Sequence, residues 1–310
     1  MTTSSPVIWL SFNLFVLLLI AFDALILSPK NKEITVKQAL MLSGFWVFLA
    51  LVFNAGIYFW LGSQRALEFF TGYLIEQSLS VDNLFVFLLI FSYFKVPVIY
   101  QRKVLFWGII GAQVMRAAFI LAGVALLHHF HWLIYLFGAF LVFSGIKLFL
   151  EKDKQIHPEG NVALKLFRRF MPVTDNYVEG QFTVKQQGRR WATPLLIVLI
   201  VIETTDLIFA LDSIPAILAI TKDPFIVYSS NIFAILGLRA MYFALAGLMN
   251  VFHHLHYGLG IILAFVGVKM LTEDIFHIPI MAALGVIAGV LTITIVTSIM
   301  FPAKSKDPII

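Results

Sequence analysis

The chain has 310 residues, is 60% hydrophobic, carries only 13% charged residues and has a mean hydropathy of +0.93. Several apolar runs approach or exceed the roughly 20 residues that a membrane helix needs, which excludes an ordinary soluble protein and predicts a polytopic membrane protein. The chain has no cysteine, so disulfides and thiolate metal ligands are excluded. The formal net charge is +5, but the basic residues lie between the apolar runs, so we assign them to membrane topology and expect no nucleic-acid partner.

Nine apolar stretches are predicted to cross the membrane as α-helices. They are residues 7–27, 39–61, 71–94, 104–127, 132–150, 193–220, 226–251, 257–272 and 278–301. The connections on one side hold 16 lysines and arginines, and those on the other side hold only Arg65 and Lys222. This asymmetry predicts that the N-terminus is outside and the C-terminus inside. We expect one transmembrane domain over 1–303 and a short cytoplasmic tail over 304–310, in the inner (plasma) membrane.

The first acidic stretch lies in the third predicted span and carries Glu76 and Asp82. A carboxylate at mid-bilayer costs about 3 kcal/mol on insertion scales, so it indicates a functional site. Ser80 and Asn83 lie beside these acids and are possible additional ligands or hydrogen-bonding supports.

Residues 151–192 form the long polar connection of the chain. They are predicted to be a cytoplasmic loop that joins two halves of the protein. A second interpretation is that this loop binds a partner or anionic lipid, with a short amphipathic segment over 162–170 on the membrane surface.

The second acidic stretch lies in the span predicted over 193–220. It carries three carboxylates: Glu203, Asp206 and Asp212. Six residues of an unbroken helix turn by about 240°, so Asp206 and Asp212 would not share a face. Pro215 has no backbone N–H and crowds the preceding turn, which predicts a break next to Asp212 that would free carbonyl oxygens for a cation. Thr204 and Ser213 are possible further ligands.

The two acidic stretches belong to an internal repeat. Superposing them places Glu76 over Asp206 and Asp82 over Asp212. Further matches join Arg116 with Arg239, Gly145 with Gly267 and Lys147 with Lys269. Each copy contains three spans, over about 71–151 and 193–273, so the copies enter the membrane from opposite sides. This is the inverted-repeat plan of secondary transporters, whose sites lie at mid-membrane on interrupted helices.

The acidic spans predict a cation site. Carboxylate, amide and hydroxyl oxygens without thiolates favour hard or borderline divalent ions such as Mn²⁺, Mg²⁺ or Ca²⁺. Burial and like charges favour protonation of some acids when the site is empty, which offers a route to exchange of metal for protons. The alternative is that these acids are structural and pair with basic residues. Arg116 and Arg239 are the possible counter-ions within the spans.

No Ser-His-Asp, HExxH or Walker-type motif is present, so we expect neither an enzyme nor an ATP-driven pump, and no cofactor.

Two motifs carry a resemblance to a known family. Glu76-x-x-Leu-Ser-x-Asp82-Asn83 and Glu203-x-x-Asp206-x-x-Phe-Ala-x-Asp212-Ser213-x-Pro215 resemble the paired signatures of the TerC family of integral membrane proteins. The resemblance covers roughly residues 10–300 and is strongest to the Alx-like, alkali-inducible branch. Ala210 stands where the family commonly has serine, and every acid of the pattern is intact.

The resemblance implies a role in metal homeostasis. The family is placed near the LysE exporter superfamily, its members are linked to manganese export, and its older name comes from tellurium resistance. It implies Mn²⁺ as the substrate and five carboxylates as the metal site: Glu76, Asp82, Glu203, Asp206 and Asp212.

The sequence therefore predicts an all-α membrane protein with about nine helices and two inverted three-helix repeats. Its expected function is secondary transport that exports a divalent metal, with Mn²⁺ first and Ca²⁺ as an alternative. A function of another class is a membrane interaction protein that supports metal loading or secretion of partners, which the sequence does not name.

Overall fold

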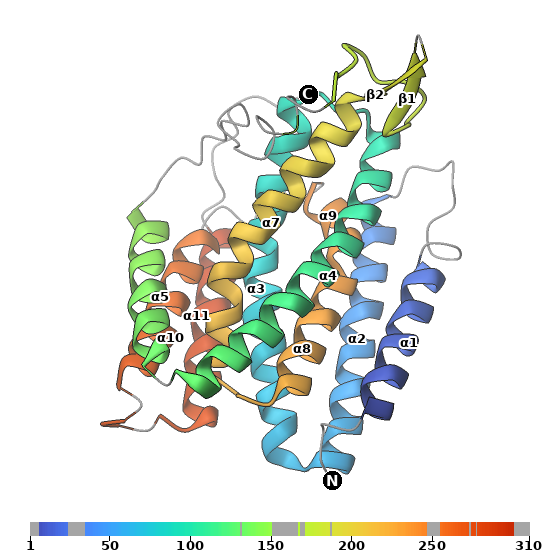
Figure 1. The fold of residues 1–310 in the computed structure, drawn as a ribbon. Coiled ribbons are helices and arrows are strands. Elements are labelled where there is room, and N and C mark those ends of the chain that lie inside the picture. Colours follow the sequence, from blue (N-terminus) through green and yellow to red (C-terminus); the bar gives the residue numbers. More distant parts are fainter. Residues whose placement is uncertain are drawn as a thin grey trace.

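A computed structural model describes residues 6–23, 35–130, 132–150, 167, 171–186, 188–246, 255–272, 274–276 and 278–300. In these residues the fold is mainly helical, with helices that run between two ends of a bundle (Figure 1). The helices are α1 (Pro6–Phe22), α2 (Val36–Leu61), α3 (Ser63–Tyr93), α4 (Val98–His129), α5 (Leu133–Leu150), α7 (Pro194–Leu218), α8 (Pro224–Leu236), α9 (Leu238–Ala246), α10 (Leu255–Thr272) and α11 (Ile280–Met300). The helical fold class is confirmed.

Local sequence signals account for several helix boundaries. Thr35 and Gln38 form a capping box that starts α2. Gly62 has a φ of 91°, which favours glycine, and it turns the chain directly from α2 into α3. The Asp223 carboxylate accepts hydrogen bonds from two backbone N–H groups in the first turn of α8, and Pro224 follows it.

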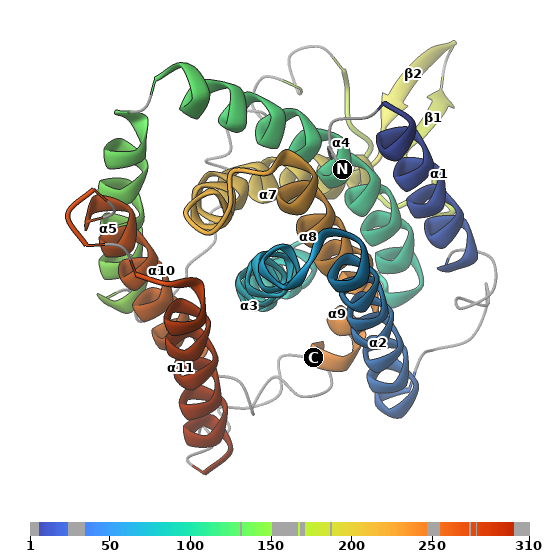
Figure 2. The ribbon, with the colours of Figure 1, turned by 90° about the horizontal axis from the view of Figure 1, so that it is seen from below.

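The most polar of the long helices lies in the middle of the bundle. Seen along the bundle, α3 is surrounded by α2, α7, α8 and α9, while α5, α10 and α11 lie together to one side (Figure 2). The outward faces of the peripheral helices carry large apolar side chains, as expected for contact with lipid. Examples are Leu10, Phe48, Phe143 and Ile293.

Six described helices are long and apolar enough to cross a membrane. A seventh candidate span is the pair α8 and α9, which bends by 41°. Two shorter apolar helices are Pro6–Phe22 and Tyr257–Thr272. These findings show a multi-pass membrane protein, while the count of nine spans and the orientation stay predictions.

The expected break in the acidic helices is wrong. α3 is helical throughout, and it begins eight residues before the predicted span because good helix formers follow Gly62. α7 is helical through Asp212 and Pro215 and ends at Leu218. Pro215 lies in the last turn, so little helix remains beyond it to be disrupted. The break occurs instead at Gly237, between α8 and α9.

The 151–192 connection contains β-structure that the sequence did not suggest. Strands β1 (Thr183–Gln186) and β2 (Arg189–Ala192) form an antiparallel hairpin at the upper end of the bundle in Figure 1. The chain is therefore not purely α-helical. The amphipathic segment predicted over 162–170 falls outside the described residues except for Phe167.

Candidate functional site

A buried arginine joins the two acidic helices. Arg116 of α4 donates from Nη2 and Nε to the two carboxylate oxygens of Asp206 on α7, at 3.0 and 3.2 Å. Its Nη1 also donates to Oε1 of Glu76 on α3. The equivalent acids of the two predicted repeats thus meet at one place. We call Glu76, Arg116 and Asp206 the central triad.

The central triad is closed off from its surroundings. The side chains of Glu76, Arg116 and Asp206 are 0%, 1% and 4% exposed. Removing one partner of a buried ion pair typically costs about 3–5 kcal/mol, because the other charge is left uncompensated. One guanidinium faces two carboxylates here, and Glu76 Oε2 has no hydrogen-bond partner among the described residues.

A small cavity lies beside Asp206. Its volume is about 20 Å³, and residues of α3, α4, α7 and α9 line it together with Asp206. A cavity needs about 10–15 Å³ to hold one water molecule, so this space has the size of a single water. Asp206 is the one polar side chain among its lining residues.

Glu203 lies one turn before Asp206 on α7, and its carboxylate packs against Gly111 of α4. A Cβ atom at position 111 would come within 2.1 Å of Glu203 Oε1 and 2.6 Å of Oε2. The missing side chain of Gly111 therefore makes the room for this carboxylate. Sequence reasoning missed Gly111, because a glycine inside an apolar run gives no sign of which side chain occupies the space beside it.

The remaining predicted acids are not part of the central triad. Asp212 is six residues beyond Asp206 on a continuous helix, so it lies on another face of α7. The side chain of Asp82 is outside what the structure describes. Among the described side chains, no group of three or more acidic or histidine residues could hold a metal ion. The five-carboxylate ligand set stays a prediction.

The predicted neighbouring ligands differ in their partners. Three buried polar atoms have no hydrogen-bond partner among the described residues: Ser80 Oγ, Asn83 Nδ2 and Ser213 Oγ. Thr204 Oγ1 instead bonds to backbone carbonyls of its own helix, including that of Ile200 at 2.8 Å. Thr204 is thus partly satisfied within its own turn, and the other three retain polar capacity inside the bundle.

Arg239, the repeat counterpart of Arg116, has different partners. It forms an ion pair with the Asp23 carboxylate and donates to the Asp23 carbonyl oxygen at 2.9 Å. Asp23 follows α1, which lies outside both predicted repeats. The sequence indicated both arginines as possible counter-ions of the acids. Among the described ion pairs, Arg116 binds the acids of α3 and α7, and Arg239 binds Asp23.

A second ionic group, with buried carboxylates and an exposed arginine, lies at the opposite end of the bundle from the hairpin. Arg65 pairs with Glu68 at 2.7 Å and with Asp223 at 3.6 Å. Thr221 also donates to Glu68, at 2.6 Å. These contacts tie the start of α3 to the connection between α7 and α8.

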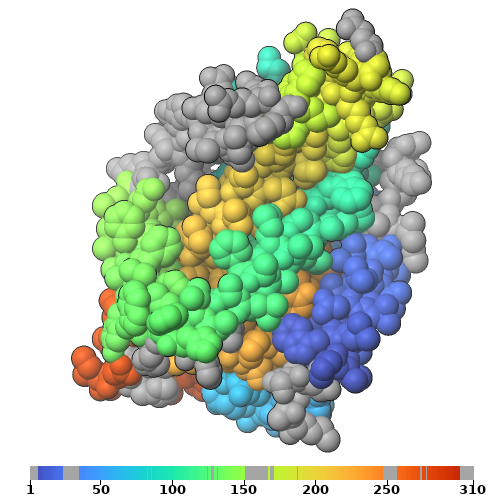
Figure 3. Space-filling model, in the orientation of Figure 1, coloured from blue at the N-terminus to red at the C-terminus, as the bar shows by residue number. Residues whose placement is uncertain are grey.

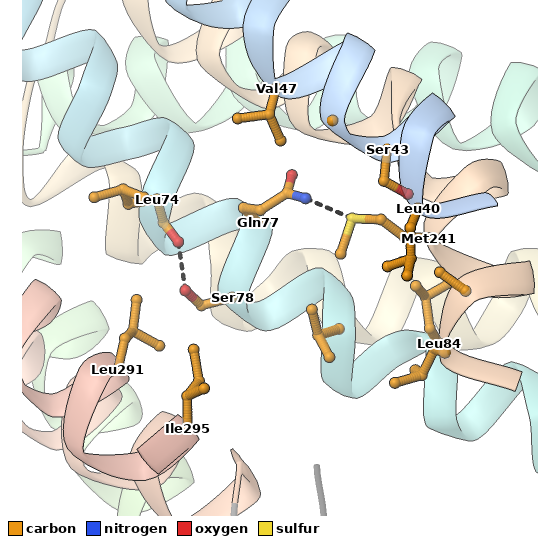
Figure 4. A pocket seen from close by; sticks show the side chains of 14 residues that line it. Leu40, Ser43, Val47, Leu74, Gln77, Ser78, Leu84, Met241, Leu291 and Ile295 are labelled. Atoms are coloured by element: carbon orange, nitrogen blue, oxygen red, sulfur yellow. Dashed lines mark hydrogen bonds between the residues drawn. The ribbon is translucent and has the colours of Figure 1, made fainter. Parts of the chain in front are cut away.

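A larger apolar cavity lies among α2, α3, α9 and α11 (Figure 4). Its volume is about 360 Å³. The few polar groups that line it include Gln77 and Ser78 of α3. Gln77 donates to the sulfur of Met241, and Ser78 donates to a carbonyl of its own helix. This lining suits an apolar ligand and not a metal ion.

The hairpin region is fixed to the ends of α3 and α4. Lys103 donates to the Gly180 carbonyl at 2.8 Å, and its ammonium group lies 4.8 Å from the centre of the Phe182 ring. Tyr177 donates to the Phe94 carbonyl at 2.8 Å, and burial raises the pKa of Tyr177 to about 12. This part of the 151–192 connection is thus a folded cap and not only a solvated linker.

Comparison with known proteins agrees with the two motifs. The profile of the integral membrane protein TerC family matches residues 61–306. An uncharacterized membrane protein of Myxococcus xanthus, STKORF319, is 50% identical over 299 residues, which cover 96% of this chain and 94% of that protein. Two further relatives, from Salmonella typhi and Escherichia coli K12, are each named as a putative membrane-bound redox modulator, Alx. They are 47% and 45% identical to this chain over 304 residues. In both cases the match covers 95% of this chain; it covers 94% of the Salmonella protein and 95% of the E. coli protein.

No solved structure matches the chain. The family match covers most of the sequence, and the related proteins match it almost from end to end. The chain belongs to the TerC family of integral membrane proteins.

Proposed function

We propose that this protein is a secondary transporter that exports a divalent cation, Mn²⁺, from the cytoplasm across the inner (plasma) membrane. The observation that carries the proposal is the meeting of Glu76 and Asp206, from two acidic helices, at one buried place in a bundle of membrane-crossing length. Buried ionisable groups are costly in a membrane and typically line ion pathways.

The packing of α5 against α10 supports two repeats related by a two-fold axis. A Cβ at Gly145 would lie 2.5 Å from the Gly260 carbonyl oxygen, and one at Gly267 would lie 2.6 Å from the Gly138 carbonyl oxygen. In the predicted repeat, Gly145 corresponds to Gly267 and Gly138 to Gly260. The two contacts are therefore copies of each other, as a two-fold axis between α5 and α10 requires.

Ion selectivity is proposed from the donor atoms and the family. The predicted site offers only oxygen ligands, which suit Mn²⁺, Mg²⁺ and Ca²⁺ alike. The link of TerC relatives to manganese favours Mn²⁺ among them. Acids that bind protons when the metal leaves would couple export to proton entry.

The test is metal flux in proteoliposomes that contain the purified protein. Mn²⁺, Ca²⁺ and Mg²⁺ are compared while internal pH is recorded. Asp206→Asn should abolish Mn²⁺ flux, whereas Asp274→Asn, which changes an exposed carboxylate, should leave it intact. Full flux in Asp206→Asn, or no flux of any metal through folded wild-type protein, would contradict the proposal.

A second candidate function is a membrane interaction protein that works through the cap around β1 and β2. The observation that favours it is the fixed packing of this cap through Lys103 and Tyr177. Related proteins are named for redox modulation, and because this chain has no cysteine, such a role would not use thiols of its own. Deleting residues 174–191 separates the candidates, since a transporter should retain flux without the cap.

A further inference from the structure

Arg116 holds the place that a transported cation would need. Its guanidinium group contacts both Glu76 and Asp206, and it satisfies both oxygens of Asp206. We propose that Arg116 is a tethered substitute for the substrate: it neutralises the carboxylates in the empty carrier, and the incoming divalent cation displaces it. This inference rests on the proposed transport function. It gives Arg116 a role in the step in which the empty carrier returns to its starting conformation.

Electrostatics gives the reason for such a group. Two ionised carboxylates without a counter-charge are strongly disfavoured inside a membrane protein. A loaded carrier has the metal ion to neutralise them while its helices rearrange. An empty carrier has no such ion, and a guanidinium carried by the chain itself supplies the missing charge. Net transport therefore needs Arg116 on the return step, but exchange of one metal ion for another does not.

The structure also offers a second partner for the displaced guanidinium. Glu203 lies one turn before Asp206 on α7, against Gly111, and Gly111 is five residues before Arg116 on α4. Glu203 and Asp206 are three residues apart, which corresponds to about 4.5 Å along α7, so a guanidinium released by Asp206 reaches Glu203 by changing its rotamer. Glu203 Oε2 is buried and has no hydrogen-bond partner among the described residues.

The charges of this arrangement fit a divalent ion. In the loaded carrier, with Glu76, Asp206 and Glu203 ionised, one divalent cation and the Arg116 guanidinium together balance the three negative charges.

Arg239 provides the matched control. It aligns with Arg116 in the predicted repeat and is also buried, but it pairs with Asp23 outside the acidic helices. Replacing Arg239 removes a buried guanidinium without touching the central triad.

The experiment compares two transport modes of reconstituted full-length protein. One is net Mn²⁺ efflux into metal-free medium, and the other is exchange of labelled Mn²⁺ with Mn²⁺ on both sides. Arg116→Gln should lower net efflux by about tenfold or more while exchange stays within about twofold of wild type. Its apparent affinity for Mn²⁺ should rise by about tenfold, because no internal cation competes for the carboxylates. Arg239→Gln should leave the ratio of the two modes unchanged.

Several outcomes would overturn the inference. Loss of both modes in folded Arg116→Gln would show that Arg116 only holds the helices in place. Unchanged net efflux, or an equal loss in Arg239→Gln, would show that the reset does not depend on Arg116. If Arg116→Gln does not fold, Arg116→Lys tests the inference instead. Lysine keeps the positive charge but cannot bind both oxygens of Asp206 side by side. Net efflux should therefore persist, and the apparent affinity for Mn²⁺ should rise. An unchanged affinity for Mn²⁺ in Arg116→Lys would then contradict the inference.

The proposed transport function has its own test in the same experiment. Absence of both net efflux and exchange in the wild-type protein would refute transport itself.

Discussion

Gly111 shows how one missing side chain positions a carboxylate. The Glu203 carboxylate occupies the volume that any other residue at position 111 would fill with its Cβ atom. The atoms in the way are the flexible end of a glutamate and not backbone. A substitution at Gly111 should therefore move the acid and leave the helix packing intact.

We predict that Gly111→Ala lowers Mn²⁺ flux by about tenfold or more, because the displaced Glu203 carboxylate can no longer serve the site. Thermal stability in detergent should be nearly unchanged. Gly108→Ala is the control, since a Cβ there makes only an ordinary 3.5 Å contact with Ile202. Equal flux in the two variants would argue against a role for Glu203.

At the scale of elements, the closest helix contact is between α5 and α10. Glycines let the two backbones approach, and this is how helices associate in lipid, where no hydrophobic effect drives them together. Backbone atoms would face the added methyl group at Gly145: the Gly260 carbonyl at 2.5 Å and the Ala264 nitrogen at 2.6 Å. The two helices would have to separate.

We predict that Gly145→Ala lowers the free energy of unfolding by about 1–3 kcal/mol, as overpacking does in cores. Gly267→Ala should have a similar effect, because its Cβ would meet the Gly138 carbonyl in the corresponding contact. Thermal unfolding in detergent measures both. Gly285→Ala in α11, with nothing within 4 Å of the added atom, should be neutral. A strong loss of stability there, or none at Gly145, would contradict this account of the interface.

The two faces of α7 have different surroundings. Ile208 and Leu211 are 60% and 46% exposed, and Asp206 is buried on the opposite side. Figure 3 shows α7 at the surface between α4 and α5. The helix therefore contacts lipid with one face and holds the central triad with the other, so movements of α7 are transmitted directly to Asp206.

At the scale of the whole molecule, the orientation in the membrane can be tested simply, because the chain has no cysteine. We predict that a cysteine at Lys185 reacts with a membrane-impermeant maleimide only in opened cells, and that one at Ile275 reacts in intact cells. Both positions are exposed in the structure. The positive-inside asymmetry predicts that the hairpin lies in the cytoplasm and the α10–α11 connection outside. The reverse labelling pattern would invert the assignment.

The sequence predicted well what depends on local composition. Apolar length located the helices, because a chain in lipid must satisfy its backbone hydrogen bonds within each segment. The sequence also named Arg116 as a possible counter-ion of the acids, and Glu76 and Asp206 both pair with it. What it could not predict depends on tertiary contacts: the pairing of Arg239 with Asp23, the space at Gly111 and the β-hairpin. The break expected at Pro215 did not occur, because α7 ends at Leu218 and a bend at the proline would redirect only the last three residues of the helix.

The central position of α3 has a consequence for biosynthesis. α3 is the most buried of the candidate spans and has lower hydropathy than α7, α5 and α11 (Figure 2). Its neighbours α7, α8 and α9 follow much later, and α9 ends at Ala246, about 150 residues after α3 ends at Tyr93. At about 5–20 residues per second, the ribosome needs roughly 8–30 s to reach that point. During that interval Glu76 lacks Asp206 and three of the helices that surround α3, so α3 stays in an incomplete bundle until the second half of the chain is made.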